Sequence, residues 1–445
     1  MGTEAHVPLA VKAQRVLDGS ALLVFRIFFG LLCTFSALRF VAKGWVTSTY
    51  IEPTFHFRYA GFAWLPEPGP VGLYALFGVM AVAGLGIATG TLYRVCTGAW
   101  LVAFVWVELL EEATYLNHYY LLTLLGTLVF LLPLHRLGGG DVRRGAVSPL
   151  QGLPAWVTWL FRGQVSCVYV YAGIAKLNGD WLLAGEPLHT WLRGMDHFPI
   201  LGPWLPLIET ALVMAWASAM YDLCLPFALG WRRTRPSAFC AVVVFHVSTW
   251  ILFPIGVFPW LMVGSSTLFF PPDWAQGWLR LPHRTLRWGN GGQTMSLGWG
   301  SGWMAIAAAC WMILQIIVPL RAWALPGDSG WTGRGFRFAW RVMLIEKTGL
   351  VEYRLHDRTS GAQWRVSPRP LLTSLQYKML CTEQEFIHEF GRHLADLHRR
   401  RGSDVAVYAD AFLSINGRPS ARSVRADVDL SQEFSDLPHD WIPAQ

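Results

Sequence analysis

The sequence predicts an all-α polytopic membrane domain followed by a small soluble α+β domain. Three observations lead to this fold class. Of the 445 residues, 53% are hydrophobic and only 15% are charged, whereas a soluble domain has about 25% charged residues. The mean hydropathy is +0.35. The apolar residues also form long runs, and these end near residue 325, where the chain becomes charged.

The membrane domain, residues 1–324, is expected to contain about nine spanning helices. Crossing the hydrocarbon layer takes roughly 20 apolar residues in a straight helix. Several runs are shorter, so the count is open by one or two. The expected spans cover residues 19–41, 71–91, 95–110, 119–134, 153–175, 205–229, 237–252, 254–271 and 302–322.

The soluble domain, residues 325–445, has no long apolar run. A helix is expected over 383–399. Strands are expected around it, because apolar and polar residues alternate in places, as in Val405–Asp410.

Composition also excludes several classes of partner. The 24 tryptophans are typical of the aromatic belts at the two faces of a bilayer. The net charge of +7 comes from basic residues in short loops between apolar runs, so no nucleic-acid partner is expected. The seven cysteines show no CxxC or Cys/His ligand spacing, and no metal site is expected.

Basic residues set the expected orientation. If the N-terminus is cytoplasmic, most arginines between spans fall in cytoplasmic loops, as the positive-inside rule requires. These are Arg94, Arg136, Arg143, Arg144, Arg232, Arg233, Arg235, Arg280, Arg284 and Arg287. The C-terminal domain is then non-cytoplasmic, and the polar clusters at 111–118, 176–193 and 246–259 all lie on its side.

Lys176 is the first candidate for chemistry, at the end of an apolar helix. Apolar surroundings disfavour the charged form of an amine, and a neutral amine can act as a base. Tyr169, Ala172 and Gly173 share its helical stripe, and the small residues leave room beside the amine. The other interpretation is an amine that snorkels to the membrane interface.

Two histidines are the next candidates. His118 follows Glu108, Glu111 and Glu112, and carboxylates inside a span usually face a cavity or a partner. A structural pair of Glu108 with a buried arginine such as Arg26 is an alternative. His246 precedes a helix-breaking turn at 253–259, which either lines a cavity or is a packed re-entrant turn.

These motifs resemble, in order, those of the vitamin K-dependent gamma-glutamyl carboxylases. The match comprises VYVYAGIAKLNGDW (Val168–Trp181), NHYY (Asn117–Tyr120), Phe245-His246 with LFPIGVFP (Leu252–Pro259), SINGR (Ser414–Arg418) and DVD (Asp427–Asp429). The chain looks like a short, bacterial-type member, from the HTTM-domain proteins, so a bacterial inner membrane is expected. It lacks the long extension of the animal enzymes.

The resemblance implies a function. Reduced vitamin K, either phylloquinol or menaquinol, would react with O2 and end as the 2,3-epoxide. The strong base so formed would remove a gamma proton from a peptide glutamate, and CO2 would trap the carbanion. Lys176 and His118 would be catalytic. Substrate contacts would come from Asn117, Tyr169, Arg193, His246 and Phe258. The implied partners are the lipid bilayer, the quinol and a Glu-containing peptide.

Two alternatives stay open. Without the animal extension, the chain could epoxidise a quinol and carboxylate nothing. It could also be a non-enzymatic lipid-binding or transport protein, although no internal repeat typical of transporters is present.

Overall fold

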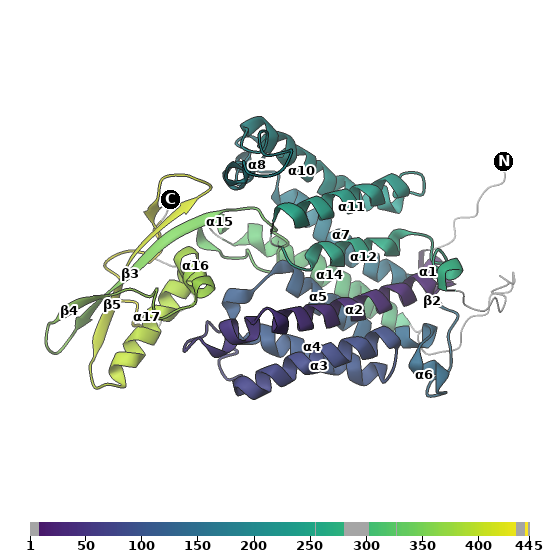
Figure 1. Ribbon diagram of the computed structural model, residues 1–445, viewed down its shortest axis with the longest axis horizontal. Coiled ribbons are helices and arrows are strands. Elements are labelled where there is room, and N and C mark those ends of the chain that lie inside the picture. The colour runs from purple at the N-terminus through teal and green to yellow at the C-terminus, as the bar shows by residue number, and fades with distance from the viewer. Residues whose placement is uncertain (1–8, 254, 280–301, 326, 433–440, 444–445) are drawn as a thin grey trace.

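The computed structural model describes residues 9–253, 255–279, 302–325, 327–432 and 441–443. Helices of the first part run side by side along the long axis, and the part that contains the sheet lies at one end (Figure 1). Helix α1 (Leu9–Gln14), the first described element, lies at the opposite end. Arg280, Arg284 and Arg287, which helped to set the expected orientation, fall outside the described residues.

Six of the described helices are long and apolar enough to cross a membrane. They are α2 (Ser20–Ala42), α3 (Gly69–Thr89), α4 (Tyr93–Leu110), α10 (Ile208–Gly230), α11 (Arg235–Leu252) and α14 (Gly302–Ala324). The predicted helical membrane domain is therefore confirmed.

The predicted count of nine spans is not confirmed. The other three predicted segments also form helices: α5 (Asn117–Leu131), α7 (Ala155–Ala175) and α12 (Phe258–Ser266). However, α5 has 15 residues and α12 has 9, fewer than the roughly 20 that a straight span needs. Helix α7 is long, but polar side chains such as Arg162 and Gln164 interrupt its apolar sequence.

Short elements connect these helices. They are α1 (Leu9–Gln14), η1 (Thr47–Ile51), η2 (Glu112–Thr114), η3 (Leu134–Leu137), α6 (Gly140–Arg143), α8 (Gly179–Leu182), α9 (Leu188–Leu192), η4 (Arg193–Met195), η5 (Thr267–Phe269), α13 (Gln276–Leu279), α15 (Ser329–Thr332) and the ribbon of β1 (Val16–Asp18) and β2 (Gly152–Pro154).

Close backbone contact joins α2 to α3. A Cβ added to Gly30 would lie 2.4 Å from the nitrogen of Ala88 and 2.5 Å from the carbonyl oxygen of Gly84. Only glycine allows this approach, which is how membrane helices gain packing energy when lipid supplies no hydrophobic drive. Arg26 of α2 donates hydrogen bonds to the carbonyls of Ala88, Leu134 and Gly138. Its guanidinium thus satisfies backbone groups, and the predicted alternative of an Arg26–Glu108 pair is not found.

The C-terminal part is an antiparallel sheet covered by two helices. The sheet order is β4-β3-β5-β6, with β3 (Lys347–Asp357), β4 (Gln363–Val366), β5 (Val405–Ile415) and β6 (Ala421–Arg422). Helices α16 (Ser374–Thr382) and α17 (Gln384–Arg399) pack on it. Both the predicted helix over 383–399 and the predicted strand at Val405 are confirmed. Cys381, the last cysteine in the sequence, is buried here as a free thiol.

Residues of the membrane domain enter the core of the C-terminal part. Phe57, from the loop after α2, stacks on Phe386 of α17 with ring centroids 4.3 Å apart. Ala113 of η2 belongs to the same buried cluster. The two parts of the chain therefore share one hydrophobic core at their junction.

Candidate active site

A cavity of about 580 Å³ lies in the membrane domain, among α7, α10, α11 and α12. Cofactor and ligand pockets usually have about 300–1,000 Å³. Most of its wall is apolar. The polar side chains on it include Lys176, Asp222, Tyr169, Tyr221 and His246.

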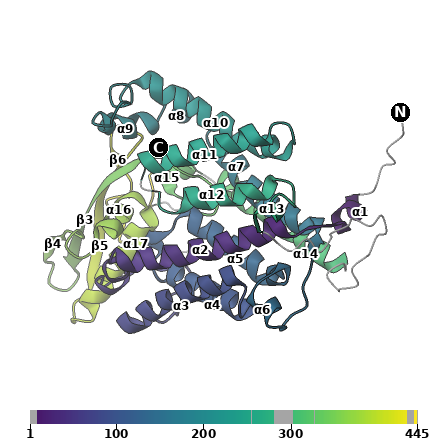
Figure 2. The same cartoon turned by 45° about the vertical axis from the view of Figure 1, so that its right-hand side comes forward.

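Part of the cavity wall is formed by residues of α10 and α11 that are also exposed on the outer surface of the helices. Ala217 and Ser218 of α10 line the cavity, as do Ala241 and Val244 of α11. We call these four residues the lateral slot. Ala217, Ala241 and Val244 are also exposed, Val244 by 65%. Both views show α10 and α11 next to each other at one side of the bundle (Figures 1 and 2).

Lys176 ends α7 and is paired with a carboxylate in the cavity wall. Its Nζ donates to Oδ2 of Asp222 in α10 at 2.5 Å, and it lies 3.5 Å from the carbonyl oxygen of Ala172. Lys176 and Asp222 are 6% and 4% exposed. Opposite charges so deeply buried compensate each other, because either one alone would be costly to remove from water.

Local sequence explains how this pair forms. A Cβ on Gly173 would lie 2.7 Å from Cγ of Leu223 and 3.0 Å from its backbone nitrogen. Glycine therefore lets α10 approach α7 one turn before Lys176. On the other side, the indole of Trp181 lies over the amine, with Nζ 5.3 Å from the ring centroid. Asn178 holds Trp181 in place by capping the turn of α8.

A second polar group faces the same cavity. The hydroxyl of Tyr169 and Nε2 of His246 are 2.9 Å apart. Nδ1 of His246 is buried and has no hydrogen-bond partner among the described residues. Buried polar groups normally find partners, so this end of the cavity has capacity to bind a polar atom of a ligand.

Four predicted site residues thus lie on the cavity: Lys176, Tyr169, His246 and Phe258. His118 does not line it. Its ring lies 5.7 Å from that of Phe258, which in turn lies 5.9 Å from His246. The ring of Phe258 is therefore a neighbour of both histidines.

Asn117 and Arg193 also lie away from the cavity wall. The side chain of Asn117 donates to the carbonyl of Arg341 and accepts from the hydroxyl of Tyr115. These contacts tie α5 to the chain that enters the C-terminal part. Arg193 is exposed on η4.

The segment 336–344 contributes to the cavity wall. Val342 and Met343 line the wall. Phe338, Trp340 and Met343 have φ values of 61°, 56° and 50°. Large side chains rarely adopt this left-handed conformation, and such strain gathers at functional sites. The segment is the least regular part of the enclosure.

The SINGR motif contacts the turn that follows Lys176. Asn416 donates to Asp180 at 2.8 Å, and Arg418 forms an ion pair with the same carboxylate. The predicted turn is correct, and Asn416 has φ of 50° within it. A hairpin of the C-terminal part therefore holds the loop between Lys176 and Trp181 from outside.

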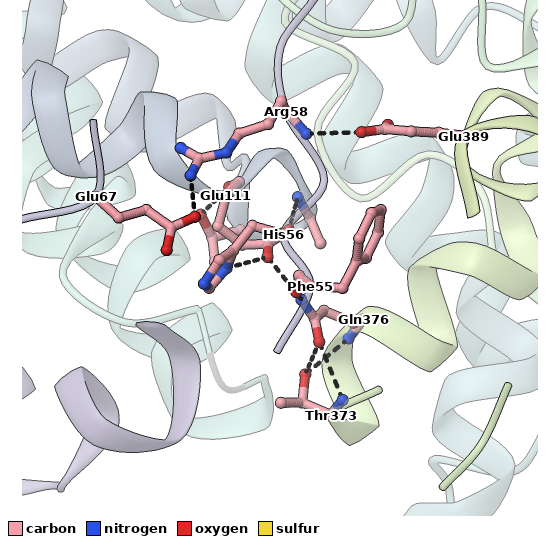
Figure 3. Close-up of polar contacts among 10 residues, drawn as sticks. Phe55, His56, Arg58, Glu67, Glu111, Thr373, Gln376 and Glu389 are labelled. Carbon is pink, nitrogen blue, oxygen red and sulfur yellow. Dashed lines mark hydrogen bonds and ion pairs between the residues drawn. The ribbon is translucent and has the colours of Figure 1, made fainter. Parts of the chain in front are cut away.

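The predicted acidic cluster at 111–112 lies at the junction of the two parts. Glu111 accepts from His56 at 3.0 Å and from Gln376 of α16 at 2.7 Å (Figure 3). Glu112 forms an ion pair with Arg337.

Two carboxyl groups near this junction have raised pKa values. Burial raises the pKa of Glu112 to about 7, although Arg337 opposes the change. Burial raises the pKa of Glu389 to about 8, although Glu389 accepts from the backbone of Arg58. The bond between Arg58 and Glu389 is drawn in Figure 3.

Asp222 is the main site residue that the sequence interpretation missed. A carboxylate inside a span is rare and marks a partner or a pathway, so its place within the predicted span 205–229 was the available signal. Its partner is 46 positions away, and sequence spacing does not show such a contact. Val342 and Met343 had no comparable signal.

Two family models match this chain. The HTTM domain matches residues 14–274, and the lumenal domain of vitamin K-dependent gamma-carboxylase matches residues 301–444. No solved structure matches it. Together with the apolar helices, the matches define a membrane protein whose C-terminal part is of a lumenal, non-cytoplasmic type. The first match covers more than half of the chain, and the chain belongs to the gamma-carboxylase-like family of HTTM-domain proteins.

Proposed function

We propose that this protein oxygenates a reduced vitamin K quinol to its 2,3-epoxide and couples this to carboxylation of peptide glutamate. The observation that carries the proposal is the Lys176 amine on the wall of a large apolar cavity. When bound, the quinol would supply, with O2, the strong base that removes the glutamate gamma proton for CO2 to trap. The protein would bind the quinol, accept its proton and exclude water.

The cavity wall suits a flat, apolar ring with polar edges. Lys176 would accept the proton of a quinol hydroxyl, and Tyr169 with His246 would bind a second oxygen. Apolar residues such as Phe258 would exclude water, which a strong base requires. The lateral slot would admit a lipid-soluble ligand directly from the bilayer.

The remaining predicted residues have supporting parts in this proposal. His118 would act through the ring of Phe258, since it is not on the cavity wall. Asn117 would hold segment 336–344 through Arg341. Arg193, exposed on η4, would meet the peptide substrate rather than the quinol.

We place the protein in a bacterial inner membrane with the N-terminus in the cytoplasm. The arginine distribution supports this orientation. The peptide glutamate would then arrive from the non-cytoplasmic side, where the C-terminal part and the turn after Lys176 lie.

The experiment gives the purified protein a reduced naphthoquinol, labelled CO2 and a Glu-containing peptide. We expect the epoxide and, in the peptide, labelled carboxyglutamate. Lys176→Ala should lower epoxide formation by about 10²–10⁴-fold, the usual contribution of a general base. Lys43→Ala, at the exposed end of α2, is the matched control and should keep full activity.

The same experiment separates the alternatives. Epoxide without labelled peptide would identify a quinol epoxidase that does not carboxylate. A folded protein that binds a quinol and leaves it unchanged would be a lipid-binding or transport protein, and the proposal would be wrong.

A further inference from the structure

We propose that Asp222 is the positioning residue of Lys176, and that the base of this site is the Lys176–Asp222 pair sharing one proton. The inference rests on the proposed function. It assigns a role to a carboxylate that no motif of the sequence marks.

Geometry is the first support. Asp222 lies on the buried stripe of α10 with Ala215 and Ala219, so its side chain is directed to α7. The close approach at Gly173 brings the two helices together at this level. The contact of 2.5 Å between Nζ and Oδ2 fixes the amine against the wall, where Trp181 covers its other side.

Charge balance is the second support. Either member alone would be a single charge in an apolar wall, whereas the pair has no net charge when it holds one proton. Arg162, the cation within α7, donates hydrogen bonds to the carbonyls of Leu268 and Phe270. It does not compete with Lys176 for Asp222.

The other titratable groups around the pair are limited in number. On the cavity wall they are Tyr169 of α7, Tyr221 of α10 and His246 of α11. Tyr169 and His246 are hydrogen-bonded to each other. Among the described lining residues, Lys176 is therefore the cation that directly meets Asp222.

The proton balance follows from this arrangement. In the resting site one proton lies between nitrogen and oxygen. When a quinol hydroxyl gives up its proton, its O–H bond breaks and a new N–H or O–H bond forms within the pair. The pair then holds two protons and one positive charge beside the quinol oxyanion. No electrons are transferred in this step, and the cavity as a whole stays neutral.

The test measures how Lys176 reacts with a small apolar acylating reagent as pH is varied. Only the unprotonated amine reacts, and mass spectrometry reports the modified fraction in the full-length protein. Asp222→Asn removes the charge that favours the ammonium. We expect the pH for half-maximal reaction to fall by at least about one unit, equivalent to a tenfold change.

The controls use the same helix and the same assay. Glu209→Gln makes the equivalent change at an exposed site of α10 and should leave the profile as in the wild type. Asp222→Glu keeps the charge but displaces it, so a smaller shift is expected. This variant also serves if Asp222→Asn does not fold.

Quinol turnover is the second readout. It should fall at least about 100-fold in Asp222→Asn, with a changed pH profile, and recover in part in Asp222→Glu. A folded Asp222 variant with the wild-type reactivity profile would overturn the role of Asp222. If the wild type does not turn over quinol but the reactivity profile of Asp222→Asn is shifted from that of the wild type, only the proposed function is refuted.

Discussion

The hydroxyl of Tyr169 forms a defined contact at the end of the cavity away from Lys176. The two are seven positions apart along the chain, which is roughly 10 Å of helix. The partner of this hydroxyl, His246, has a free Nδ1 among the described residues. A ligand with oxygens on opposite edges of a ring could meet both ends at once.

Replacing Tyr169 with Phe should therefore weaken quinol binding. The loss of one hydrogen bond, about 1 kcal/mol, should raise the KM for quinol by roughly fivefold to tenfold, with a smaller change in kcat. Steady-state kinetics measure the two separately. Tyr171→Phe is the control, because the Tyr171 hydroxyl bonds to the carbonyl of Ile316 in α14, away from the cavity. Equal effects of both variants would contradict the assignment.

For single residues, the sequence predicted which side chains line the cavity better than it predicted their contacts. Lys176, Tyr169, His246 and Phe258 lie on one cavity because motif order reflects a shared fold. His118 does not, because the start of α5 places it behind the ring of Phe258. Asp222 was missed because the approach of α10 to α7 depends on Gly173, whose effect is visible only in three dimensions.

Among the elements, α10 and α11 are packed so as to leave the lateral slot open. Small residues from both helices, Ala217, Ser218 and Ala241, line it. Under the proposed function, a long apolar tail would stay in the bilayer at this slot while the ring is bound.

Filling the slot should select against such a tail. We expect Ala217→Phe to raise the KM for a quinol with a long isoprenoid tail by about tenfold, roughly 1.4 kcal/mol. The KM for a naphthoquinol without a tail should stay at its wild-type value. Met220→Phe, on the exposed lipid side of α10, is the control. Equal losses for both quinols would mean that the tail takes another route.

Element types were predictable where the pattern was long and regular. Helices occupy all nine predicted apolar segments, because hydropathy over about 20 residues is a strong signal. The number of membrane spans was not predictable, because hydropathy alone does not separate a short buried helix from a span. Helix α12, for example, has only 9 residues. In β5, burial alternates over 407–415, but Val405, Ala406 and Val407 are all buried, so the alternation predicted over Val405–Asp410 is met only in its second half.

For the whole molecule, the junction between the two parts depends on buried carboxyl groups. Glu112 and Glu389 have raised pKa values of about 7 and about 8 in the folded protein, against 4.5 ordinarily. Between these values the folded state holds protons that the unfolded state has lost. Their contribution to stability is thus complete below about pH 4.5 and is lost as pH rises to about 8.

Docking of the C-terminal part should therefore weaken between about pH 5 and pH 8. We expect limited proteolysis and thermal unfolding to show a less stable junction at the higher pH. Glu389→Gln should flatten this dependence, since the amide oxygen can still accept from Arg58 without titrating. Glu52→Gln, at an exposed position shortly before Arg58 in the chain, should leave the pH dependence unchanged. A dependence unchanged in Glu389→Gln would exclude this group as its source.

The single thiol of the C-terminal part offers a practical consequence. Cys381 is 3% exposed and lies between the sheet and its helices. It is the one cysteine in residues 325–445, and the structure has it as a free thiol. A bulky maleimide that cannot enter lipid should spare Cys381 in the native state and label it on unfolding. The labelling rate would then report how often the C-terminal part unfolds in intact cells.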